Sequence, residues 1–212
     1  MSVFQKRPLI RACIAVAIVF GASGCISVLP DKSTPLDRYG LEAPTQPGAT
    51  APTSDLRLVI NRPAASGALK NTRIALKRRP LQYEYFTGAE WTDRTPVLVQ
   101  QMFTRAFENS GKIMAVGARS SGVAGDYALH TDIRAFEADY TNGMRRARVS
   151  FYVKLLTNPS GDVLAAKLFE VEAPIARDTS EAAVSALNEA AVEAVSQTVT
   201  WVLNAGADAT SS

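Results

Sequence analysis

Short stretches of alternating hydrophobic and polar residues recur along the chain, a pattern typical of strands that bury one face of a sheet. The turn Thr141-Asn142-Gly143 separates two of the longer stretches, and its central positions tolerate positive φ, which predicts a β-hairpin. A second turn, at residues 158–162, leads into another long strand. The predicted strands are Leu56–Ile60, Arg73–Lys77, Leu81–Phe86, Ile113–Val116, Asp126–Tyr140, Arg145–Leu156 and Val163–Glu172.

Two longer segments carry apolar residues at the helical spacing of three and four. In the first, we expect Thr95 to cap the helix and Pro96 to occupy its first position. Asn109-Ser110-Gly111 ends that helix, with Gly111 suited to a left-handed cap. In the second, Asp178 is the expected cap, with Glu181 three residues later as in a capping box.

The order of these elements predicts an α+β fold, a mainly antiparallel sheet with two helices packed on one face. We place this domain at residues 56–204 and expect a disordered tail at 205–212. Residues 25–55 hold five prolines among Ser, Thr, Gly and Ala, which predicts a flexible tether. Within the tether, Leu36–Leu41 is an apolar island that could dock onto the domain.

Residues 1–24 have the features of an export signal. Lys6, Arg7 and Arg11 precede a short apolar stretch, which is shorter than the roughly 20 residues of a membrane-spanning helix. Ala22-Ser23-Gly24-Cys25 then resembles the lipobox of bacterial lipoproteins. The resemblance implies cleavage before Cys25 and attachment of acyl chains, palmitate among them, to Cys25. An Asp directly after the lipobox cysteine would resemble an inner-membrane retention signal, but this chain has Ile26 there. The resemblance therefore implies that the protein is anchored in the outer membrane and faces the periplasm.

Charge and cysteine content agree with that interpretation. The first 24 residues hold three of the 23 Lys and Arg and none of the 20 Asp and Glu, so the remaining chain carries 20 of each. This balance gives no broad basic surface for nucleic acid. Cys13 leaves with the signal, and a lone Cys25 in an oxidising compartment is unusual unless it is blocked. We interpret the arginine clusters at 78–79 and 145–148 as solvated faces or strand edges.

The sequence has no residue pattern typical of catalysis or of cofactor binding. His130 is the single histidine, and it stands on a predicted strand between Leu129 and Thr131. A Ser–His–Asp arrangement with Asp126 or Asp132 is formally available, but no nucleophile-elbow motif accompanies it. One histidine and no free cysteine also leave only carboxylates for a metal. We therefore expect no enzyme, no metal and no cofactor.

The segment Tyr83–Pro96, which contains Trp91-Thr92-Asp93-Arg94, resembles the ABC-type transport auxiliary lipoprotein component family. These proteins are lipoprotein partners of Mce-domain (MlaD-like) and paraquat-inducible-type transport systems. The resemblance spans residues 36–203. It continues at Ala106-Phe107, Ser110-Gly111, Asp126–Leu129, Ala165–Glu170, Ala186–Ala190 and Trp201-Val202, and Tyr39-Gly40-Leu41 matches near the tether.

The resemblance implies an accessory or adaptor subunit of a Mce-type ABC lipid transport system. Its partner would be a Mce or MlaD-like periplasmic protein, and assembly into a homo-oligomer stays open. Trp91 is the first candidate for a partner contact, since Trp often anchors interfaces. Packing of Trp91 beneath the helix start is the alternative. Asp93, Arg94 and Tyr85 are further candidate contacts.

Two other functions stay open at this stage. The chain could be a lipid-anchored binding module of another envelope assembly machine, such as a lipopolysaccharide-assembly or TolB-like domain. It could also be a lipid-anchored hydrolase that uses a serine and His130.

Overall fold

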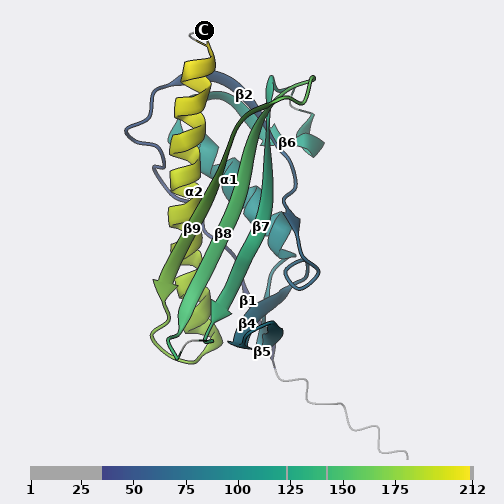
Figure 1. Ribbon diagram of the computed structural model, residues 1–212, viewed down its shortest axis with the longest axis vertical. Helices are drawn as coiled ribbons and strands as arrows, with labels where there is room; N and C mark the ends of the chain where they lie inside the picture. The colour runs from purple at the N-terminus through teal and green to yellow at the C-terminus, as the bar shows by residue number, and fades with distance from the viewer. Residues whose placement is uncertain (1–34, 123, 142, 211–212) are drawn as a thin grey trace, which may run out of the picture. The chain divides into compact units, whose positions relative to one another are not determined.

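The long strands predicted in the second half of the chain form a three-stranded meander in the computed structural model, which describes residues 35–122, 124–141 and 143–210 (Figure 1). β7 (Tyr127–Asp139) pairs antiparallel with β8 (Arg146–Thr157) along its whole length. β8 in turn pairs antiparallel with β9 (Val163–Pro174). The signal segment and Cys25 lie outside the described residues.

The other edge of β7 pairs with three shorter strands, all of them parallel to it. β2 (Ser54–Ile60) lies beside the start of β7, β3 (Ala64–Ala65) beside its middle and β4 (Arg73–Arg79) beside its end. The sheet extends at one end through β6 (Ile113–Ala118). At the other end it extends through β5 (Gln82–Trp91) and β1 (Asp37–Tyr39). A short 3-10 turn, η1 (Arg119–Ser121), follows β6. The parallel pairings make a mixed sheet of nine strands.

Two helices, α1 (Thr95–Ser110) and α2 (Ser180–Thr210), cover one face of this sheet, which confirms the predicted α+β class. Figure 1 shows both helices behind the β7–β8–β9 meander. Gly111 ends α1 at φ 60°, as predicted. Helix α2 continues through Thr210, so the expected disordered tail from residue 205 is wrong for the described residues.

Both helix starts differ from the prediction by one residue. Arg94 occupies the cap position of α1, and its side chain makes no capping hydrogen bond, so Thr95 is the first helical residue. At α2 the Thr179 hydroxyl accepts the Ala182 N–H at 3.2 Å. The expected cap, Asp178, binds an arginine of β4 instead, because that charged partner gives it a stronger hydrogen bond than a backbone amide.

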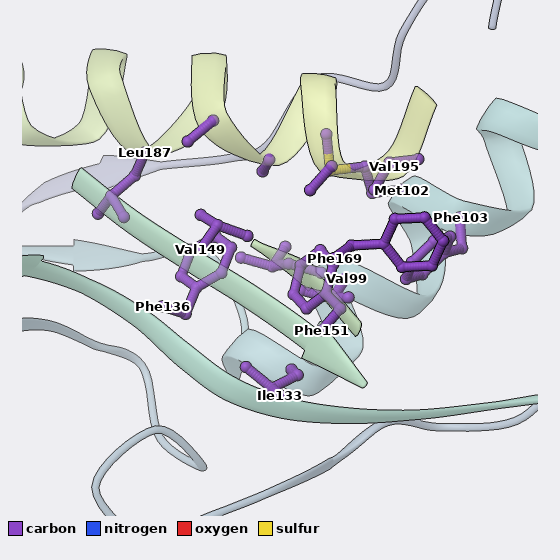
Figure 2. Close-up of a cluster of buried hydrophobic side chains, with 14 of the residues drawn as sticks. Val99, Met102, Phe103, Ile133, Phe136, Val149, Phe151, Phe169, Leu187 and Val195 are labelled. Atoms are coloured by element: carbon purple, nitrogen blue, oxygen red, sulfur yellow. The ribbon is translucent and has the colours of Figure 1, made fainter. Parts of the chain in front are cut away.

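The core lies between the sheet and the helices. Alternate residues of β8 point into it, as their period of two predicted, and Figure 2 shows Val149 and Phe151 facing Leu187 and Val195 of α2. The buried residues of β8 on this side are Ala147, Val149, Phe151, Val153 and Leu155, each with no exposed surface.

A chain of aromatic rings crosses this core. Trp91 of β5 meets Phe136 of β7 edge-on at 5.8 Å between ring centroids. Phe136 stacks on Phe151 of β8 at 6.4 Å, and Phe151 contacts Phe103 of α1 at 5.7 Å. The rings therefore connect three strands and a helix, and edge-on and offset contacts of this kind add to the stabilisation from burial.

The chain before β2 is part of the folded unit, which begins at Pro35, and this differs from the expected tether that reaches residue 55. The apolar island at Leu36–Leu41 supplies β1, which pairs with β5. The following strap, residues 40–53, runs over both helices. Glu42 donates its N–H to the Asn188 side chain at 2.9 Å, and Asn109 donates to the Pro44 carbonyl at 2.8 Å. Proline-rich composition thus marks an extended segment here, and side-chain contacts with the helices fix its path.

One ion pair is set into the sheet on the face away from the helices. Glu137 of β7 is fully buried, and its carboxylate accepts a hydrogen bond from the Lys77 ammonium of β4 at 2.9 Å. Burial by itself would lower the pKa of Lys77, but the hydrogen bond to Glu137 raises it. The Tyr83 ring lies 4.4 Å from the same ammonium. The pair therefore locks the register of β4 on β7 at the charged position.

Removing the ring at the centre of the aromatic chain should destabilise the unit strongly. Phe151→Ala leaves a cavity between Phe136 and Phe103, and we expect a loss of about 3 to 5 kcal/mol in the free energy of unfolding. Chemical denaturation followed by circular dichroism measures it. Met114→Ala, at a side chain 56% exposed, is the control and should change stability by less than about 0.5 kcal/mol. Equal losses in the two variants would contradict this description of the core.

Replacing one partner of the buried ion pair should lower the free energy of unfolding more than replacing both partners. Lys77→Ala leaves the Glu137 carboxylate buried without a cation, and we expect a loss of about 3 kcal/mol. The double variant Lys77→Met/Glu137→Leu should recover most of that loss. Arg148→Ala is the matched control, because Arg148 and Glu170 pair at 3.5 Å with both side chains about half exposed. It should cost at most about 1 kcal/mol. A double variant as unstable as Lys77→Ala would disprove the assignment.

Candidate functional site

Trp91, the first candidate for a partner contact, lies in the core. Its side chain is 1% exposed and packs on Phe136. A bulge at Gly88, with φ 72°, turns it inward: Arg73 pairs with Glu90, but Ala75 pairs with Tyr85, so β5 has three more residues than β4 in that interval. Of the two interpretations, packing beneath the start of α1 is therefore the one that the geometry supports.

The other candidate contacts do not form one cluster. Tyr85 lies on the face of the sheet away from the helices, where its hydroxyl donates to the Ala68 carbonyl at 3.2 Å and Arg73 stacks on its ring at 3.7 Å. Asp93 and Arg94 lie on the exposed loop between β5 and α1, and the Asp93 carboxylate accepts the Arg94 N–H at 2.6 Å. Asp93 and Arg94 alone of the four present exposed side chains to a partner.

His130 is exposed on β7 and has a polar neighbour rather than a nucleophile. Its Nε2 lies 2.6 Å from the Asn61 side-chain nitrogen, and Asn61 also accepts a hydrogen bond from Arg119 at 2.9 Å. Burial, together with the charges of Arg119 and Lys154, lowers the pKa of His130. The nearby Asp132 pairs with Arg134 at 3.9 Å. Within residues 35–122, 124–141 and 143–210, no group of three or more metal-ligating side chains comes together.

The structure brings the two arginine clusters to one end of the sheet, which we call the hairpin end. It comprises the β4–β5 turn (Arg78–Leu81), the β7–β8 turn (Tyr140, Thr141 and Gly143–Arg146) and the link from β9 to α2 (Ile175–Asp178). These turns lie side by side because β4 runs parallel to β7, and the Tyr140 N–H donates to the Lys77 carbonyl at 2.8 Å. Figure 1 shows them at the lower end, opposite the end of α2.

Charged hydrogen bonds tie the three segments of the hairpin end together. Arg78 donates to both Asp178 carboxylate oxygens, at 3.1 and 3.2 Å, and these bonds lower the pKa of Asp178 and raise that of Arg78. The Arg78 guanidinium also lies 5.2 Å from the Tyr140 ring. Burial and the neighbouring Asp178 carboxylate raise the pKa of Tyr140. Arg145 donates to the carbonyls of Ile175 and Ala176 at 3.5 and 3.4 Å.

The surface of the hairpin end combines these arginines with exposed apolar side chains. Leu81 and Met144 stand at the two turns, and both are exposed. A shallow depression of about 590 Å³ lies between the β7–β8 turn and the end of β9. Its apolar lining comes from Met144, Ala173, Pro174 and Ile175, and its charged lining from Arg145, Arg146 and Glu172, with Gly143 between them.

Sequence reasoning missed this surface because it treated each arginine cluster separately. Residues 78 and 178 are a hundred positions apart, and only the pairing of β4 with β7 brings them together. One signal was available in the sequence. Met144 directly precedes Arg145-Arg146, and Leu81 follows Arg78-Arg79 after one residue, so each turn combines a large apolar residue with two arginines.

Solved structures contain the same arrangement of strands and helices. A crystal structure of a DUF330 protein from Xanthomonas campestris is 27% identical with a TM-score of 0.77, covering 82% of this chain and 99% of that one. A crystal structure of an uncharacterised protein is 13% identical with a TM-score of 0.63, covering 79% of this chain and 99% of its own. At this identity the second likeness shows the fold alone. Among curated proteins, none matches the chain.

The family comparison covers most of the folded unit. The model of the ABC-type transport auxiliary lipoprotein component family matches residues 39–199, from β1 into the second half of α2. None of the helices in the described residues is long and apolar enough to cross a bilayer. The match confirms the resemblance drawn from the Tyr83–Pro96 segment and the later motifs. The chain therefore belongs to the family of ABC-type transport auxiliary lipoprotein components.

Proposed function

We propose that this protein is an outer-membrane-anchored periplasmic lipoprotein that serves as the accessory or adaptor subunit of a Mce-type ABC lipid transport system. The observation that carries the proposal is the family match over residues 39–199, which includes α1, the first two thirds of α2 and nearly all of the sheet. A match of that extent supports a role shared with the family for most of the folded unit. The partner that we infer is a Mce or MlaD-like periplasmic protein.

The anchor that we infer is a set of acyl chains on Cys25. Nine residues, 26–34, separate Cys25 from the start of the folded unit at Pro35. At about 3.3 Å for each extended residue they would span at most about 30 Å. An anchored domain would therefore stay close to the bilayer, and two or more acyl chains would hold it there stably.

The work that we infer is docking, without bond making. The family is described as a transport component, and the single histidine, His130, contacts Asn61 and lies among basic side chains. Asp93 and Arg94, in the loop before α1, are the exposed charged residues of the family-like Tyr83–Pro96 segment. We therefore place a partner contact on this loop.

Lipidation can be measured directly in cells. Radiolabelled palmitate should enter the wild-type protein, and Cys25→Ser should abolish the label and release the protein from the membrane fraction, because the lipobox thiol that would be acylated is gone. Cys13→Ser is the control and should keep both the label and the membrane location. An unlabelled wild-type protein would contradict the anchor while leaving the family membership intact.

Partner capture tests the adaptor role. The tagged protein, solubilised from membranes, should recover a Mce-domain protein, and Arg94→Glu should reduce the recovery several-fold, because a reversed charge at a contact is repulsive. Arg105→Glu, also exposed but in the middle of α1, is the matched control and should not change it. If the wild-type protein recovers no Mce protein under conditions that preserve other envelope complexes, the proposed partner is wrong.

A further inference from the structure

We propose that the hairpin end is a membrane-docking surface, with Leu81 and Met144 entering the interface of a phospholipid bilayer. In this arrangement Arg79, Arg145 and Arg177 contact the lipid phosphates. The surface is distinct from the loop at Asp93 and Arg94, which we assigned to a protein partner. It also acts independently of acylation, because it consists of side chains of the folded unit.

The first argument is the exposure of two large apolar side chains at the tips of turns. Leu81 is 102% exposed and Met144 is 59% exposed, so neither contributes appreciably to the core. Leu81 also has φ 64°, and among the described residues no other residue except glycine has a positive φ. Gly or Asn would be more favourable in that conformation, so folding does not explain a leucine there. An external apolar environment does explain it.

The second argument is the sign of the charge that remains on this surface. Arg78 pairs with Asp178 at 3.1 Å and also with Glu84 at 3.8 Å, and Arg146 pairs with Glu172 at 2.8 Å. Arg79, Arg145 and Arg177 are exposed, and in the part of the chain that the structure describes no carboxylate lies within ion-pair distance of them. Three guanidinium groups without a carboxylate partner thus lie beside the two exposed apolar side chains. A bilayer offers the complementary arrangement, anionic phosphates above apolar acyl chains, and Arg binds phosphate through paired hydrogen bonds.

The shape of the surface is the third argument. The depression of about 590 Å³ has an apolar lining of Met144, Ala173, Pro174 and Ile175 beside the charged Arg145 and Arg146. Apolar and cationic groups on one concave surface suit the boundary between a headgroup and its acyl chains.

The direction of the chain is the fourth argument. β1 runs parallel to β5, and Asp37 pairs with Ala89. β5 leaves the β4–β5 turn at Gln82, so the described residues that precede Asp37, Pro35 and Leu36, lie on the side of Asp37 that faces the hairpin end. Leu36, 45% exposed, adds an apolar side chain on that approach.

Vesicle flotation of the chain from residue 25 onward, carrying Cys25→Ser, tests the surface without an acyl chain. This protein keeps the whole folded unit, which begins at Pro35. We expect it to float with vesicles of phosphatidylcholine and phosphatidylglycerol at low ionic strength, and much less with phosphatidylcholine alone. Leu81→Asn/Met144→Asn should lower the partition coefficient by about tenfold or more, because most of the inserted apolar area is lost. Asn also tolerates the left-handed conformation at position 81, so the fold should persist.

Two further variants separate charge from apolar contact. Arg79→Gln/Arg177→Gln should remove most of the preference for anionic vesicles and its dependence on salt. Met114→Asn is the matched control, since Met114 is 56% exposed on β6, away from the hairpin end, and it should float like the unsubstituted protein.

Two results would overturn the proposal. The first is a protein that does not float with anionic vesicles, or that floats equally well after Leu81→Asn/Met144→Asn. The second is a Leu81→Asn/Met144→Asn protein that still binds vesicles but no longer recovers a Mce protein. That result would make the hairpin end a protein-docking surface. Vesicle binding that survives a failed Mce capture would leave the membrane surface standing and reject only the proposed transport partner.

Discussion

The structure depends on β7, whose two edges pair in different ways. Along one edge, β7 pairs with the antiparallel β8 over its whole length, Tyr127 to Asp139. Along the other edge it pairs in turn with β2, β3 and β4, all parallel to it. A strand paired on both edges has nearly all of its backbone groups satisfied, so it can lie in the middle of the sheet. Every other strand takes its position from β7, either directly or through one neighbour or two.

This arrangement separates the packing of the protein from the surfaces that can bind. The aromatic chain from Trp91 to Phe103 and the buried side chains of α2 fill the space between sheet and helices. The strap at residues 40–53 covers the helices from outside, and Lys112 fixes it by donating to the carbonyls of Ala49 and Ala51. What remains accessible are the turns, the loop before α1 and the polar face of the sheet, where binding residues usually lie.

The hairpin end follows from the same topology. Because β4 and β7 are parallel, both strands end on the same side, and the turns that follow them come together with the link into α2. The bidentate bond from Arg78 to Asp178 then fixes the start of α2 against β4. The hydrogen bonds hold the turns of the hairpin end in place, so Leu81 and Met144 can enter a bilayer interface together. The proposed roles of Cys25 and of the hairpin end therefore agree: an acylated Cys25 would supply affinity for the membrane, and the hairpin end would supply orientation.

The sequence by itself determined the elements whose signals are local. The alternation of apolar and polar residues in β8 predicted a strand with one buried face, Gly111 predicted the end of α1, and the order of strands and helices predicted the α+β class. The motifs around Tyr83–Pro96 predicted the family. The signals for β8 and for the end of α1 depend on neighbours within a few positions, where periodicity and turn chemistry act, and the class follows from the order of such elements.

Only the tertiary structure decided the features that depend on distant partners. It turned Trp91 inward through the bulge at Gly88, made the proline-rich strap part of the folded unit, and gave Asp178 to Arg78 while Thr179 capped α2. It also gathered the two arginine clusters at one end of the sheet. The physical reason is common to all four: strand pairing and charged hydrogen bonds join residues that are tens of positions apart, and no local pattern records which partner a strand or a side chain will meet.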